Sequence, residues 1–231
     1  MSAQSSHANH PLPTPSGIPR PVFGTERTRW RGTLHAWTTP LSIIMGLLLV
    51  LLANGTAAEW TAAVFALTSI LLFGTSAIYH RGNWSARQTA WLRRADHANI
   101  FLLIAGTYTP VAWLILPLKQ AIIVLSIIWA GALLGVLVRT LWPGAPRWLS
   151  VSLYILLGWG AVMYLPAFFA ASPAVMILII IGGLFYTVGA VFYALKRPNP
   201  LPTVFGFHEL FHACTILAYL CHWTAVLLVA L

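Results

Sequence analysis

Charged side chains are scarce in this chain. Lys, Arg, Asp and Glu together make up 7% of its 231 residues, and only four of them are acidic. An ordinary soluble domain carries about 25% charged residues. Because 59% of the residues are hydrophobic, a water-soluble globular domain is excluded. The composition instead predicts a protein that crosses a membrane several times.

Cysteine is nearly absent as well. Cys214 and Cys221 are the two cysteines, and both lie in the last apolar segment, seven residues apart and outside any CxxC motif. We interpret them as small packing residues rather than as a disulfide or a pair of metal ligands.

Seven apolar windows account for most of the chain. Each is close to the roughly 20 residues that a helix needs to cross a bilayer, and short connections containing Pro, Gly or polar residues separate them. We therefore predict an all-α membrane protein with a bundle of seven transmembrane helices. The windows cover residues 34–54, 59–80, 96–116, 120–141, 148–168, 173–195 and 207–231.

The first 30 residues differ from the rest in composition. They contain five prolines amid Ser, Thr and Gly, which predicts a disordered tail for residues 1–30 and a transmembrane domain for residues 31–231. No positively charged region leads straight into a short apolar stretch with a small-residue cleavage site, so we do not expect a cleaved signal peptide.

The distribution of positive charge orients the bundle. Cytoplasmic loops accumulate Lys and Arg, and with the N-terminus inside the cell, 12 of the 13 basic residues fall on the cytoplasmic side and only Lys119 falls outside. We predict a cytoplasmic N-terminus and an external C-terminus. The net charge of +9 then reflects topology and contact with anionic lipids, and we expect no nucleic-acid partner.

The last apolar segment opens with the motif His208-Glu-Leu-Phe-His212. Two histidines four residues apart lie on one face of a helix. The predicted topology places His80, at the end of the second helix, at the same depth, together with Asp96 at the start of the third. Three neutral histidines with a fourth position left to water form the ligand set of a catalytic zinc. The alternative is that these are interfacial histidines that hold no metal.

Two further side chains are candidates for the chemistry of such a site. Ser76 lies one turn before His80 on the same helical face, where its hydroxyl can bind a water or a substrate carbonyl. Zinc lowers the pKa of a bound water to about 7, and Asp96 is a candidate to take the proton from it. The alternative for Asp96 is a surface salt bridge with Arg93 or Arg94, worth less than about 1 kcal/mol if exposed.

The remaining ionisable residues receive simpler interpretations. His222 lies ten residues beyond His212, about 15 Å deeper, so we expect it to line a cavity without sharing the metal. Glu209 occupies the position of the general base in soluble HExxH zinc proteases, and the pattern leaves that role open. The other histidines are interpreted as interfacial residues: His7, His10, His35 and His97.

Three motifs at these separations resemble the hemolysin III family of bacterial membrane proteins, which is related to the progestin and adiponectin receptor family and more distantly to alkaline ceramidases. The resemblance covers about residues 30–231. Its carriers are Ser76-Ala-Ile-Tyr-His80, Arg93-Arg-Ala-Asp96-His-Ala-Asn-Ile-Phe-Leu-Leu-Ile-Ala-Gly-Thr-Tyr-Thr-Pro110, and His208-Glu-Leu-Phe-His212 followed by His222.

The resemblance implies a multi-pass protein of the bacterial inner membrane. It also implies a zinc ion held by His80, His208 and His212 at the cytoplasmic end of a seven-helix bundle, with Asp96 and Ser76 near the metal-bound water. The receptor relatives often carry Gln at the position of Glu209, which weakens a general-base role for that residue.

We interpret the chain as a zinc-dependent hydrolase that cleaves an amide or ester bond of a membrane lipid entering between the helices. Two alternatives belong to other classes. The family name suggests a pore-forming or membrane-perturbing protein, although the windows lack the polar faces that a pore favours. A third possibility is a sensor of membrane state in which the zinc is structural.

Overall fold

The computed structural model of the chain describes residues 28–142, 144–160 and 162–231, and within these residues the regular elements are all helical. The elements are α1 (Thr33–Leu52), α2 (Thr56–Arg81), α3 (Ala86–Ile115), α4 (Leu118–Leu141), α5 (Arg147–Gly158), the short 3₁₀ helix η1 (Val162–Tyr164), α6 (Leu165–Ala171), α7 (Pro173–Leu195) and α8 (Phe207–Ala230).

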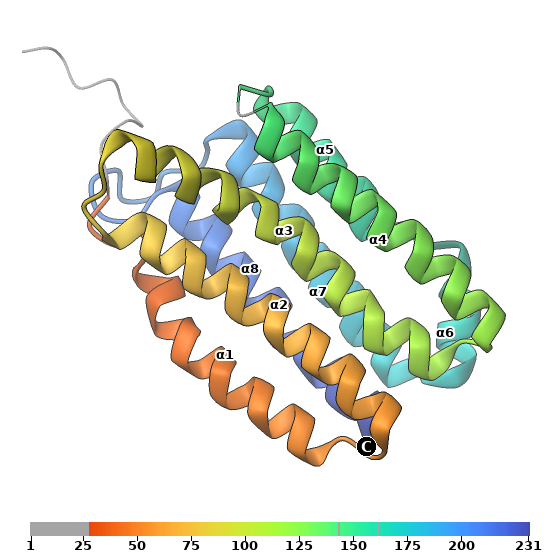
Figure 1. Cartoon of the computed structure of the whole chain (residues 1–231). Helices are drawn as coiled ribbons and strands as arrows, with labels where there is room; N and C mark the ends of the chain where they lie inside the picture. Colours follow the sequence, from red (N-terminus) through yellow and green to blue (C-terminus); the bar gives the residue numbers. More distant parts are fainter. Residues whose placement is uncertain (1–27, 143, 161) are drawn as a thin grey trace, which may run out of the picture.

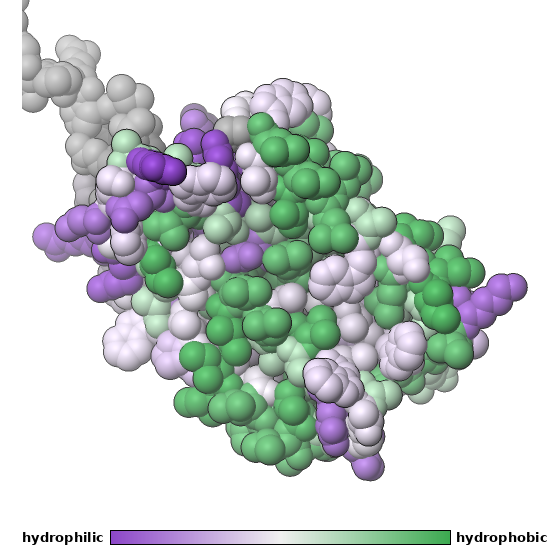
Figure 2. All heavy atoms as spheres, in the orientation of Figure 1, coloured by the Kyte–Doolittle hydropathy of each residue, from purple (hydrophilic) through white to green (hydrophobic). Residues whose placement is uncertain are grey.

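Within the described residues, seven helical spans are long and apolar enough to cross a membrane, as the sequence predicted. Figure 1 shows them as long, roughly aligned helices. Figure 2 shows apolar atoms over the middle of the visible face and hydrophilic atoms gathered mainly toward one end. The protein is therefore a multi-pass membrane protein of the all-α class.

The fifth span is broken rather than continuous. The predicted window 148–168 corresponds to α5, η1 and α6 together, which form the span Arg147–Ala171. Gly158 and Gly160 lie at the break, where glycine is a weak helix former, and Pro166 lies in the first turn of α6, a position that accepts proline.

Helix α3 begins earlier than the hydropathy of the sequence predicted. Ser85 and Gln88 form a reciprocal capping box, in which Ser85 Oγ accepts a hydrogen bond from the Gln88 backbone N–H and Gln88 Oε1 accepts one from the Ser85 N–H. The helix therefore starts at Ala86 instead of residue 96. Asp96 lies almost three turns inside α3, so its predicted place at the start of the helix is wrong.

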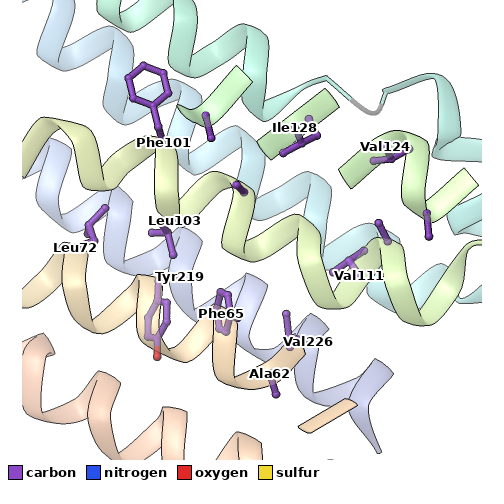
Figure 3. Packing of buried hydrophobic residues seen from close by; sticks show 14 of the residues in the cluster. Ala62, Phe65, Leu72, Phe101, Leu103, Val111, Val124, Ile128, Tyr219 and Val226 are labelled. Atoms are coloured by element: carbon purple, nitrogen blue, oxygen red, sulfur yellow. The ribbon is translucent and has the colours of Figure 1, made fainter. Parts of the chain in front are cut away.

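Helix α8 lies at the centre of the bundle. It packs against α1, α2, α3 and α7. Tyr219 of α8 stacks on Phe65 of α2 at 5.8 Å between ring centroids and meets Phe73 of the same helix edge-on at 5.1 Å. Figure 3 shows Tyr219 and Phe65 among the buried residues between these helices. This packing holds α8 beside α2, the helix that carries His80.

Small residues let neighbouring helices approach closely. A Cβ atom added at Gly106 of α3 would lie 2.9 Å from Cβ of Thr68 on α2, and one added at Gly135 of α4 would lie 2.4 Å from the Phe101 ring on α3. A Cβ atom added at Gly131 would lie 2.8 Å from Leu157 of α5, so the Gly131 to Gly135 repeat in α4 faces two different helices.

The chain between residues 28 and 32 is tied to the bundle. Arg29 and Trp30 donate backbone hydrogen bonds to the carbonyl oxygens of Thr203 and Val204 in the connection between α7 and α8. Residues 28–30, predicted as the end of the tail, therefore lie against the folded domain. Residues 1–27, with His7 and His10, lie outside the described residues, and the disordered tail stays a prediction.

Candidate metal centre

Three histidines converge at one end of the bundle. His80 lies in the last turn of α2, and His208 and His212 lie in the first two turns of α8. Each offers one ring nitrogen, and the three nitrogens lie within 4.8 Å of one another. His80 and His212 are 8% and 2% exposed, and His208 is half-buried. These three residues are called the triad below.

The spacing within the triad is compatible with a metal ion. Nε2 of His80 and Nε2 of His208 are 3.1 Å apart. Two imidazole nitrogens bound to one tetrahedral zinc at 2.0–2.1 Å lie about 3.3 Å apart. Imidazole is a common zinc ligand, and three protein ligands leave a fourth position for water or substrate. The triad could therefore hold a metal ion, and its donor set suits zinc.

Asp96 and Ser76 lie beside the triad. Oδ2 of Asp96 is 3.9 Å from Nε2 of His80, and the buried Ser76 lines the cavity beside Asp96. Asp96 also approaches Nδ1 of His97 at 3.5 Å. The carboxylate thus faces histidines inside the bundle, while Arg94 lies over the Trp91 ring. The sequence left open a salt bridge between Asp96 and Arg93 or Arg94 at the membrane surface. Among the described residues, Asp96 instead lies beside His80 and His97.

His35 was predicted to be interfacial, and the structure shows that this was wrong. Its side chain is 2% exposed, and its ring stacks on the ring of His212 with 3.7 Å between centroids and 12° between planes. Neither ring nitrogen has a hydrogen-bond partner among the described residues. A single histidine in the first turn of α1 gave no sequence signal for this position, because it depends on how α1 packs against α8.

His97 also belongs to the site rather than to the interface. Its Nδ1 lies 2.8 Å from the carbonyl oxygen of Arg93, so Nδ1–H donates, and Nε2 then accepts a hydrogen bond from the Tyr193 hydroxyl at 3.1 Å. Its position next to Asp96 in the sequence was the available signal. Tyr193 of α7 had no such signal.

Glu209, the acid of the HExxH pattern, is occupied by structural contacts. Its Oε1 accepts hydrogen bonds from Thr28 Oγ1 at 2.6 Å and Arg31 Nε at 2.7 Å, and its Oε2 accepts one from the Gly206 N–H at 2.8 Å. The side chain is fully buried. The sequence left a general-base role open, but in the structure Oε2 of Glu209 caps α8 and Oε1 binds the segment before α1.

An internal cavity runs from the triad into the bundle. Its volume is about 160 Å³, roughly ten times the space that one water molecule needs on the same measure. Most of its lining is apolar side chains from α3, α5, α6, α7 and α8. At one end it reaches Ser76, Asp96, His208 and His212, and it also reaches His222, as predicted. A long apolar molecule therefore has space beside the triad.

Known proteins resemble this chain over most of its length. Residues 23–223 match the family model described as Haemolysin-III related. The chain is 31% identical to the Hemolysin-3 homolog of Bacillus subtilis (strain 168) over 169 residues, which cover 71% of this chain and 78% of that protein. It is 30% identical to Hemolysin-3 of Bacillus cereus over 167 residues, 71% of this chain and 76% of that protein.

Proposed function

The chain belongs to the haemolysin-III related family, and on that premise we propose that it is a zinc-dependent hydrolase of the bacterial inner membrane. Its substrate would be a membrane lipid with an amide or ester bond. The family match does not carry this proposal by itself, because a family can host several functions on one fold.

The observation that carries the proposal is the junction of the triad with the apolar cavity. His208 and His212 line the same cavity as Ile100, Met176 and Ile180. Ligand sites are typically apolar clefts with a few convergent polar groups. A lipid whose chain occupies the apolar part would have its polar linkage at the histidines.

The triad would hold the metal through three neutral imidazoles. A zinc ion bound there would polarise the scissile carbonyl and lower the pKa of a coordinated water. Asp96 would take a proton from the attacking water and return it to the leaving nitrogen or oxygen as the amide or ester bond breaks. Ser76, which lines the cavity with Asp96, would keep the carboxylate in position by donating a hydrogen bond to it.

Two observations inform the alternatives. Relatives carry the name Hemolysin-3, which suggests membrane lysis, but the mainly apolar lining of the cavity does not favour a water-filled pore. The second alternative is a sensor of membrane state with a structural zinc. It is favoured because the three ligands come from two helices, so a metal there would tie α2 to α8. That role needs no carboxylate beside the metal.

The test uses purified wild-type protein and the Asp96→Asn variant, each reconstituted in lipid. Each is given amide-linked and ester-linked lipids, and the released fatty acid is measured by mass spectrometry together with the zinc content. We expect Asp96→Asn to retain zinc and to lose turnover by about 10² to 10⁴-fold, the usual effect of removing a positioned base.

Glu59→Gln is the matched control, because Glu59 is an exposed carboxylate in the first turn of α2, at the helix end opposite to His80. Its turnover should equal that of the wild type. If the wild-type protein contains zinc and cleaves neither class of lipid, the hydrolase is rejected in favour of the structural zinc.

A further inference from the structure

The cavity contains a second polar position, far from the triad. Tyr186 of α7 and His222 of α8 both line it, and their ring centroids are 5.4 Å apart. His222 is 7% exposed. His222 lies ten residues beyond His212 on the same helix, a rise of about 15 Å. His222 is therefore about 15 Å along α8 from the triad, with apolar lining between them.

Each of the two side chains has a polar atom without a partner. The hydroxyl oxygen of Tyr186 and Nδ1 of His222 are buried and make no hydrogen bond among the described residues. Other hydroxyl groups along the cavity are satisfied. Thr107 and Thr215, for example, donate to backbone carbonyl oxygens of their own helices. Buried polar atoms are normally paired, so this pair is suited to a ligand.

The hydrogen-bonding roles of the pair follow from its contacts. Nε2 of His222 lies 3.2 Å from the carbonyl oxygen of Ile179, which can only accept, so Nε2 carries the hydrogen. Burial of the ring without an acidic partner favours its neutral form, in which Nδ1 is a free acceptor. The hydroxyl of Tyr186 supplies a donor. The pair thus contains one acceptor and one donor that lack partners among the described residues.

The His222 ring is held in this orientation by its neighbour on α7. A Cβ atom added at Gly182 would lie 2.3 Å from Cδ2 and 2.4 Å from Nε2 of the ring. Because the glycine lets the ring lie directly against the α7 backbone, Nε2 stays near Ile179 and Nδ1 is left for another partner.

We propose that Tyr186 and His222 bind a hydroxyl group carried by an otherwise apolar ligand of the cavity. A hydroxyl both donates and accepts, so it satisfies Nδ1 of His222 and the Tyr186 hydroxyl together, whereas a carbonyl oxygen only accepts and leaves Nδ1 unpaired. The inference deepens the proposed function, because it names the substrate class as a lipid with a hydroxyl about 15 Å from the bond at the triad. The binding itself requires no hydrolysis.

The experiment compares two probes that differ by one group: a long unbranched fatty acid and its counterpart with one hydroxyl in the middle of the chain. Dissociation constants for the purified full-length protein are measured by titration calorimetry. We expect the wild type to bind the hydroxylated acid roughly tenfold more tightly, because two buried atoms gain partners. Tyr186→Phe, which removes the donor and keeps the ring, should abolish most of that preference.

Tyr108→Phe is the matched control, because Tyr108 also lines the cavity but donates its hydroxyl to the carbonyl oxygen of Gly158. It should keep the preference. Equal affinity of the wild type for both acids overturns the inference, as does a preference that survives in Tyr186→Phe.

Turnover and zinc content are measured on the same samples. A preference for the hydroxylated acid without cleavage of any lipid supports this inference and rejects the hydrolase. Cleavage without the preference does the reverse. The two proposals therefore fail separately.

Discussion

At the scale of single residues, the triad and its neighbours Asp96 and Ser76 were predictable from the sequence, and the other residues around the triad were not. The four-residue spacing of His208 and His212 placed them on one face of a helix, and the predicted topology placed His80 at the same depth. His35 and Tyr193 reach the site through the packing of α1 and α7. No local sequence pattern shows which helices will be neighbours. Similarly, His222 was expected in the cavity, but its partner Tyr186 was not.

Glu209 shows why a local pattern does not by itself decide the role of a residue. In a soluble HExxH protease the acid serves the metal-bound water. Here its two oxygens accept hydrogen bonds from Thr28, Arg31 and Gly206. Two of these partners, Thr28 and Arg31, lie 181 and 178 positions away in the sequence, and a motif search along α8 does not include them.

We therefore predict that Glu209→Gln destabilises the protein without emptying the metal site. Removing the charge weakens the pairing with Arg31 and leaves a buried hydrogen-bond network imperfectly satisfied, at a cost of about 2–4 kcal/mol in the free energy of unfolding. The measurement is the thermal unfolding midpoint in detergent, together with zinc content. Glu59→Gln, the same change at an exposed carboxylate, should shift the midpoint much less. Unchanged stability with lost turnover would instead identify Glu209 as a general base.

At the scale of the elements, hydropathy located every span but not every helix end. The start of α3 is set by the capping box of Ser85 and Gln88, which lies outside the apolar window because the first turns of the helix are polar. At about 1.5 Å per residue, a 30-residue helix is about 45 Å long and exceeds the roughly 30 Å of hydrocarbon. Asp96 consequently lies within a continuous helix, where its position relative to His80 is well defined.

The break in the fifth span follows a different rule. An apolar window reports length and composition, and residues 148–168 satisfy both. Helix continuity also depends on glycine and proline, and Gly158, Gly160 and Pro166 divide this window between α5 and α6. The Gly158 carbonyl accepts a hydrogen bond from Tyr108 of α3, so the break also supplies a contact beside the cavity.

At the scale of the whole molecule, successive spans run in opposite directions, and most of the basic residues lie at the end of the bundle that holds the triad. The described arginines and lysines lie near the ends of α2, α4 and α7 and the starts of α1, α3 and α5, whereas Lys119 lies at the start of α4 at the opposite end. Since loops rich in Lys and Arg stay in the cytoplasm, we expect the triad to face the cytoplasmic leaflet.

Reporter fusions check this orientation. A reporter at the N-terminus and one in the loop before Arg87 should show cytoplasmic activity, and a reporter fused after Leu231 should show external activity. A cytoplasmic reporter after Leu231 together with an external one near Arg87 would show that the orientation is the opposite of the predicted one. The triad and its cavity would then be reached from the other leaflet.

Zinc content tests the account most directly, because the hydrolase and the structural-zinc alternative both depend on a metal at the triad. Elemental analysis of the purified wild-type protein should give about one zinc per chain. The double variant His208→Ala with His212→Ala should contain almost none, since His80 alone cannot hold the ion. Ser76→Ala should keep its zinc, because Ser76 lies beside Asp96 and is not one of the three ligands. Full zinc content in the double variant would contradict the assignment of the metal to these histidines.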